Sequence, residues 1–208
     1  MIKKKMLKND LPSLVLASAS RSRRQMLEKA GIECITQAAD IDEGAVKIRL
    51  QASGAGPEEI SEALAVEKAR VVAQDHPGKV ILGGDQILVC EGRLFDKPVN
   101  REEAATHLAF FRGKQHYLYT SYALLRGDQV LTCETVRPRL VMRDFSADFL
   151  EDYLDRSGDK ILSSVGGYLL EDLGSQLFSE IEGDYYAILG LPLLQVMRDL
   201  RALKILKS

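Results

Sequence analysis

The sequence of 208 residues predicts an α/β protein with a mixed central sheet. Short apolar segments typical of strands alternate along the chain with amphipathic segments of helical spacing. A hydrophobic share of 46% is ample for a buried core. The sequence has no internal repeat and no low-complexity linker. We therefore expect a single domain at 13–208, preceded by a basic tail at 1–12.

The first elements follow from apolar runs and caps. Residues 13–18 (SLVLAS) predict a buried strand, and the next segment, 21–30, predicts a helix whose N-cap is Ser20. Residues 33–43 are typical of a strand that ends in acids. The glycine-containing segment 44–57 predicts a mobile loop.

The middle of the chain is the most regular part. Residues 57–76 predict a long helix, with acids in its first turn and a Pro-Gly pair after its end. Residues 79–98 predict a buried strand, a glycine break and a second strand in a hairpin. A capped helix is expected at 100–113, with Asn100 as its N-cap.

The last part alternates strands and helices again. Residues 116–145 predict two or three strands joined at RGDQ. A helix follows, capped by Ser146 and stopped by Gly158. Residues 159–190 are punctuated by glycines and receive no assignment, and an amphipathic helix after Pro192 closes the chain.

Composition excludes several classes of protein. The net charge of -2 argues against a general nucleic-acid binder. The three cysteines (Cys34, Cys90 and Cys133) are far apart, which argues against a disulfide framework and favours a reducing compartment. No apolar run reaches the roughly 18 residues that span a bilayer. We expect a cytoplasmic protein with no nucleic-acid or membrane partner.

The residues that suggest chemistry are acids and bases near strand ends. Asp85 follows a buried strand and two glycines, where α/β sheets tend to place ligands. Carboxylate oxygens hold divalent cations, and cationic side chains screen phosphate charge. From the pattern alone, Asp85 serves equally well as the cap of a turn. Likewise, the arginines of LASASRSRR form either a phosphate site at a helix N-terminus or a solvated basic face.

Five motifs, taken together, resemble the Maf family of nucleotide pyrophosphatases. They occur in the family's order and cover the chain from residue 13 to about 201. They are LVLASASRSRRQMLEKAGI, IDE at 41–43, LAVEKAR at 64–70, ILGGDQILVCEGRLFDKP at 81–98 and GGYLLEDLGSQLFSEIEGDYYAILGLPL at 166–193. The P-loop, Rossmann and GxSxG signatures are absent.

The resemblance implies a fold and a reaction. The fold is a curved mixed β-sheet flanked by helices, with two lobes around a nucleotide cleft. The protein is a homodimer in which a divalent metal, usually Mg²⁺, supports hydrolysis of a nucleoside triphosphate between its α and β phosphates. An association with arrest of cell division is implied as well.

The resemblance also implies roles for individual residues. Asp85 is the proton acceptor that activates water, and Glu43 and Asp85 hold the metal. Lys97 acts at the catalytic centre by contacting phosphate. The expected substrate-binding residues are Ser18, Arg23, Lys68, Gln86 and Glu171.

The sequence departs from the family pattern at several of these motifs. Ser22 replaces the first arginine of the Pro-Arg-Arg motif, and Ser163 replaces an acid. Glu171 stands in place of a glutamine. Gln86 stands where thymidine- and uridine-type members carry threonine and where members acting on 7-methyl-GTP tend to carry glutamine. The sequence alone does not fix the base specificity.

Three functions are compatible with these residues. The first is an active nucleoside triphosphate pyrophosphatase. The second, motivated by Ser22 and Ser163, is a nucleotide-binding regulator of cell division with little or no catalysis. The third is a hydrolase of other phosphate esters, which would release orthophosphate rather than pyrophosphate.

Overall fold

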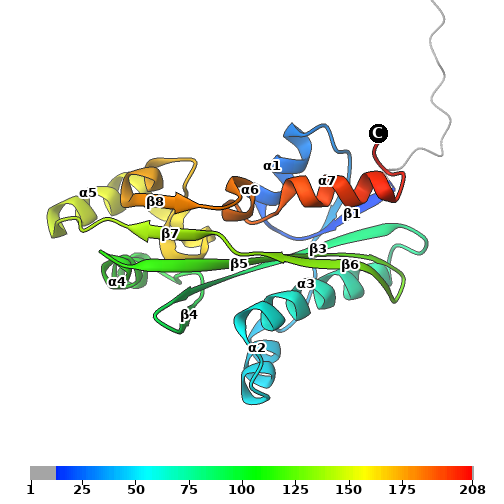
Figure 1. Cartoon of the computed structure of the whole chain (residues 1–208), viewed down its shortest axis with the longest axis horizontal. Coiled ribbons are helices and arrows are strands. Elements are labelled where there is room, and N and C mark those ends of the chain that lie inside the picture. Colours follow the sequence, from blue (N-terminus) through cyan, green and yellow to red (C-terminus); the bar gives the residue numbers. More distant parts are fainter. Residues whose placement is uncertain (1–12, 208) are drawn as a thin grey trace, which may run out of the picture.

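The computed structural model describes residues 13–207, so the predicted basic tail at 1–12 lies outside the described residues. Its strands form one mixed sheet (Figure 1). They are β1 (Leu14–Ala17), β2 (Ile35–Gln37), β3 (Val80–Cys90), β4 (Arg93–Phe95), β5 (Gln115–Arg126), β6 (Gln129–Val136), β7 (Arg139–Met142) and β8 (Phe178–Glu182). The order is β2-β1-β3-β5-β7-β8, with β4 beside β3 and β6 beside β5. This confirms the predicted α/β fold.

The helices lie on both faces of this sheet (Figure 1). The α-helices are α1 (Arg21–Lys29), α2 (Glu43–Ala52), α3 (Pro57–Ala73), α4 (Arg101–Phe111), α5 (Ala147–Ser157), α6 (Tyr185–Ile188) and α7 (Leu193–Ala202). Short 3-10 helices at 158–163, 165–167 and 173–177 occupy part of the region 159–190, for which the sequence predicted no secondary structure. None of the described helices has both the length and the apolar character needed to cross a membrane.

Two long central strands divide the molecule into two lobes. β3 and β5 pair along most of their length. The first half of β3 pairs with β1 and the second half of β5 with β6, which makes the first lobe. The second half of β3 pairs with β4 and the first half of β5 with β7, which makes the second lobe. The predicted two-lobed arrangement therefore arises from one twisted pair of strands.

Each lobe has its own hydrophobic core. In the first lobe, β1, β3 and β5 are covered by α1 and α7 on one face and by α3 on the other. In the second lobe, α4, α5 and the 3-10 helices cover the sheet with aromatic side chains such as Phe111 and Tyr168. Alternate residues of the central strands serve opposite faces, because side chains on a strand point alternately up and down.

The predicted glycine break in 79–98 is wrong, because β3 runs unbroken through Gly83 and Gly84. A Cβ on Gly83 would lie 2.0 Å from the backbone oxygen of Ala65 in α3. A Cβ on Gly84, on the opposite face, would lie 3.4 Å from Arg23 Nε. The two glycines therefore let a helix and an arginine approach the strand closely, and they do not interrupt it.

The predicted mobile loop at 44–57 is also wrong, because residues 43–52 form α2. The Asp42 side chain caps this helix by accepting a hydrogen bond of 2.9 Å from the backbone N–H of Ala45. Val46 and Leu50 pack against the cluster formed by Ile60, Leu64 and Ile87. The predicted strand at 33–43 is correspondingly short, since only residues 35–37 pair with β1.

A buried histidine occupies the core of the second lobe. The His116 ring stacks on Phe111 with 5.3 Å between the ring centroids. Its Nε2 lies 2.8 Å from the Tyr168 hydroxyl, whereas its Nδ1 has no hydrogen-bond partner among residues 13–207. Burial disfavours the charged ring and lowers the pKa of His116 to about 4. The imidazole is therefore neutral in the folded protein over the physiological range.

Acid should weaken the second lobe through His116. The pKa falls from 6.5 to about 4 on folding, so the unfolded chain binds the extra proton first as the pH drops. Stability is complete above about pH 6.5, and about 3 kcal/mol is lost on acidification towards pH 4, at about 1.4 kcal/mol per pKa unit. Urea unfolding of the wild type and of His116→Gln across this range measures the loss. An equally steep loss in the variant would contradict the assignment to this ring.

Candidate active site

The site lies where one edge of β3 has no neighbouring strand. β1 pairs with β3 only as far as Gly83, and β4 begins to pair at Leu88. Within the described chain, residues 84–87 therefore have no strand partner on this edge. A cavity of about 420 Å³ opens there. Asp85 and Gln86 point to opposite faces of the sheet, yet both line the cavity.

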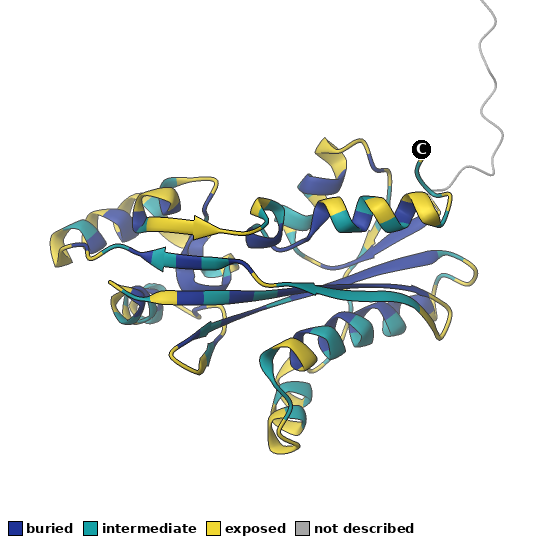
Figure 2. Ribbon diagram, in the orientation of Figure 1, coloured by how far each residue is buried: buried dark blue, intermediate teal, exposed yellow. Residues whose placement is uncertain are grey.

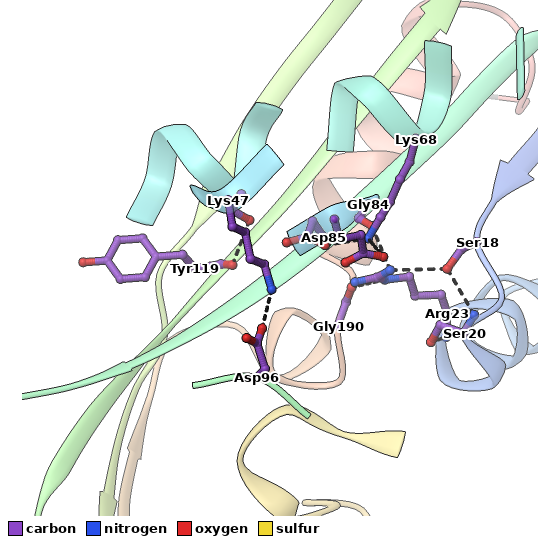
Figure 3. A network of polar contacts seen from close by, with 12 residues as sticks. Ser18, Ser20, Arg23, Lys47, Lys68, Gly84, Asp85, Asp96, Tyr119 and Gly190 are labelled. Carbon is purple, nitrogen blue, oxygen red and sulfur yellow. Dashed lines mark hydrogen bonds and ion pairs between the residues drawn. The ribbon is translucent and has the colours of Figure 1, made fainter. Parts of the chain in front are cut away.

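Three charged side chains meet at the cavity, and Figure 3 shows two of them, Lys68 and Asp85. The ammonium group of Lys68, from α3, donates to Asp85 Oδ1 at 2.7 Å and lies 2.8 Å from Glu43 Oε1. Asp85 and Lys68 are both buried, while Glu43, the first residue of α2, is half exposed. The close approach of α3 to Gly83 brings Lys68 within reach of the strand. Lys68 is buried and points inward, towards the strand.

The two carboxylates of this group have the chemistry of a cation site. Burial alone would raise the pKa of Glu43, but Lys68, Lys47 and Lys97 outweigh it and hold the pKa below its ordinary value. Asp85 Oδ2 is buried and has no hydrogen-bond partner among the described residues. Hard oxygen donors suit Mg²⁺, which is typically bound by one or two carboxylates together with substrate phosphates. These residues therefore fit a divalent cation.

The donor set is limited to these carboxylates. In residues 13–207 no group of three or more His, Cys, Asp or Glu side chains is arranged to hold a metal ion. A cation held by Glu43 and Asp85 would therefore depend on water and phosphate oxygens for its remaining ligands. Binding of the metal and of a phosphate ligand should be coupled for this reason.

Arg23, from α1, links β3 to the segment after α6 at the site. Its Nε donates to the carbonyl oxygen of Gly190 at 2.7 Å, and its Nη1 donates to that of Gly84 at 2.8 Å (Figure 3). Ser18 Oγ, 3.3 Å from the same Nη1, lies behind Arg23 and is not among the residues that line the cavity. Burial lowers the pKa of Arg23, although Asp85 and Glu43 oppose this. The alternative interpretation, in which Arg23 belongs to a solvated basic face, is therefore wrong.

Two further lysines line the cavity. Lys97, in the segment after β4, lines the cavity. Burial lowers its pKa, and the nearby positive charge of Arg23 adds to this effect. Lys47, from α2, also lines the cavity and forms an ion pair with Asp96. Lys47 was not predicted from the sequence, because 44–57 was expected to be a loop. In a helix, the spacing of four residues would have placed Lys47 on the same face as Glu43.

The remaining predicted residues of the cavity wall are Gln86 and Glu171. The Gln86 amide nitrogen is 2.9 Å from the carbonyl oxygen of Ala187 and 3.2 Å from that of Ile188. Gln86 therefore holds the turn around α6 in addition to lining the cavity. Glu171 is exposed and lines the cavity together with Ser163. All the predicted site residues except Ser18 thus contribute to the cavity wall.

The geometry excludes one structural reading of Asp85. It lies within β3, paired with Ser121 of β5, so it does not cap a turn. A buried carboxylate that is bonded to a buried lysine, and whose second oxygen has no partner within residues 13–207, has the chemistry to bind a divalent cation together with phosphate groups.

Comparison with known proteins names the class more closely. The chain belongs to the Maf-like protein family, whose model matches residues 13–203. A nucleoside triphosphate pyrophosphatase of Granulibacter bethesdensis is 47% identical over 188 residues, which are 90% of this chain and 95% of that protein. A 7-methyl-GTP pyrophosphatase of Brucella suis is 45% identical, covering 90% of this chain and 94% of that protein.

A solved structure resembles part of the chain. It is a nucleoside-triphosphatase / dITP/XTP pyrophosphatase of Mycobacterium abscessus, with a TM-score of 0.39 and 17% sequence identity. The match covers 64% of this chain and 76% of that one.

Proposed function

We propose that this protein is a nucleoside triphosphate pyrophosphatase, which hydrolyses its substrate to a nucleoside monophosphate and pyrophosphate. The observation that carries the proposal is the contact of Lys68 with both Asp85 and Glu43 inside a cavity that also holds Arg23 and Lys97. Relatives that are 44–47% identical over about nine tenths of the chain bear the name nucleoside triphosphate pyrophosphatase.

Asp85 is the proposed proton acceptor. A general base must lie within hydrogen-bond reach of the water that it activates, and Asp85 has an oxygen, Oδ2, that no described side chain occupies. Glu43 and Asp85 are the proposed ligands of the divalent cation, with Mg²⁺ as the expected ion. When bound, this cation neutralises part of the phosphate charge. Lys68, which contacts both carboxylates, is proposed to hold them in place beside the cation.

The other predicted residues receive roles in binding. Lys97 and Arg23 are the proposed phosphate contacts, since cationic groups in an enclosed site stabilise the charge that develops during phosphoryl transfer. Gln86 and Glu171, which also line the cavity, are proposed to contact the substrate. Ser18 is proposed to act through Arg23, because its hydroxyl orients the guanidinium. By resemblance to the family we also propose a homodimer.

A nucleotide panel tests the proposed reaction. The purified protein is incubated with ordinary nucleoside triphosphates and 7-methyl-GTP, with Mg²⁺ or with EDTA, and the products are separated. We expect equal amounts of monophosphate and pyrophosphate with Mg²⁺, and no turnover with EDTA. Release of orthophosphate would indicate a phosphate-ester hydrolase instead. Nucleotide binding without turnover of any member of the panel would favour the regulator.

A further inference from the structure

One cation of the cavity has only a weak partner. Lys47 is largely enclosed, with 19% of its side chain exposed, whereas 74% of the Asp96 side chain with which it pairs is exposed. Exposed ion pairs contribute at most about 1 kcal/mol, because water screens the attraction and both side chains lose freedom. Lys68, in contrast, has two carboxylate partners, one of them buried. Lys47 can therefore exchange its partner more easily than Lys68 can.

Lys47 also stands on the least anchored element of the site. None of the residues of α2 is buried, and Figure 2 shows the helix projecting from the body of the protein. An element with few buried contacts shifts at low cost. Glu43 and Lys47 are one helical turn apart, and both line the cavity. A ligand that draws in Lys47 therefore moves Glu43 with it.

We propose that Lys47 is a further polyphosphate-binding residue, which exchanges Asp96 for a phosphate oxygen and thereby positions Glu43 through α2. This inference rests on the proposed polyphosphate substrate. A phosphate carries more charge than one carboxylate and forms strong charge-assisted hydrogen bonds with an ammonium group. Asp96 then acts as a competitor that occupies Lys47 while the cavity holds no polyphosphate.

Because Lys47 binds polyphosphate and Asp96 competes for Lys47 in this proposal, substitutions of the two residues should affect the affinity for polyphosphate differently. Lys47→Gln should raise the KM for nucleoside triphosphate, and the Kd for inorganic tripolyphosphate, about tenfold, since one charge-assisted contact is lost. Asp96→Asn should leave both constants unchanged or lower, because the competitor is removed. A purely structural ion pair predicts that both variants weaken binding to the same extent. That result would overturn the proposal, as would unchanged binding in Lys47→Gln.

Control variants distinguish a specific loss of polyphosphate binding from misfolding, and calorimetry makes the test independent of the proposed reaction. Arg49→Gln removes the same charge from an exposed position of α2 outside the cavity and should leave the Kd unchanged, while Lys47→Arg should retain binding. Calorimetry with tripolyphosphate needs no turnover. The difference in Kd between the wild type and Lys47→Gln therefore tests the role of Lys47 even if no nucleotide is hydrolysed. Conversely, an active enzyme whose Lys47→Gln variant binds tripolyphosphate normally refutes only the role of Lys47.

Discussion

Replacing Asp85 with asparagine should lower kcat/KM for the best nucleotide substrate by about three to four orders of magnitude. General bases contribute roughly 10²–10⁴-fold to a rate, and Asp85 is in addition a proposed metal ligand. The amide has the shape of the carboxylate, so the packing of β3 against α3 should survive. Steady-state assays of pyrophosphate release, at saturating Mg²⁺, measure the effect. The fall should appear mainly in kcat.

A matched substitution shows whether this effect is local. Asp128→Asn makes the same chemical change in the exposed turn between β5 and β6. It should leave kcat/KM within about twofold of the wild type and the melting temperature nearly unchanged. An Asp85→Asn enzyme that retains more than about a tenth of the wild-type kcat would remove Asp85 from the role of base.

Replacing Lys68 with methionine should affect both stability and metal binding. The change leaves two neighbouring carboxylates without the ammonium group that touches both. Breaking a buried pair costs roughly 3–5 kcal/mol, and the half-exposed position of Glu43 reduces this to about 3 kcal/mol. The bare carboxylates should then attract a cation more strongly. Mg²⁺ should therefore raise the melting temperature of this variant more than that of the wild type.

Thermal unfolding with and without Mg²⁺ tests this prediction without any turnover. Lys160→Met removes a lysine from an exposed ion pair with Asp172 and should change the free energy of unfolding by less than about 1 kcal/mol. If Mg²⁺ stabilises the Lys68 variant no more than the wild type, Glu43 and Asp85 do not form a cation site. Activity should fall as well, because Lys68 no longer holds the carboxylates in place.

Local chemistry made most of the fold predictable. The side chains of Ser20, Asn100 and Ser146 each accept a hydrogen bond from the backbone N–H three residues on, as predicted for N-caps. Apolar runs predicted the main strands for a similar reason, since a buried strand needs apolar side chains on both faces. These signals lie within a few residues of one another, so the sequence displays them directly.

Contacts between distant segments account for what the sequence did not reveal. Helix α2 depends on Val46 and Leu50 packing against α3, which no local pattern shows. Gly83 and Gly84 have low strand propensity, and pairing with β5, together with β1 at Gly83, keeps them extended. The same is true of the site. The motifs predicted Asp85, Lys68 and Glu43, whereas Lys47 and the two carbonyl contacts of Arg23 depend on how the segments pack.

The edge of β3 that has no strand partner at residues 84–87 also affects how substitutions in this strand are interpreted. In a paired strand, odd- and even-numbered positions face different surroundings, so a single ligand rarely meets both. Here Asp85 and Gln86 line the same cavity from the two sides of the strand. One is bonded to a helix lysine and the other to the carbonyl groups around α6. If the proposed function holds, substitutions at two consecutive positions should therefore affect separate properties, namely the reaction at Asp85 and the shape of the substrate-binding wall at Gln86.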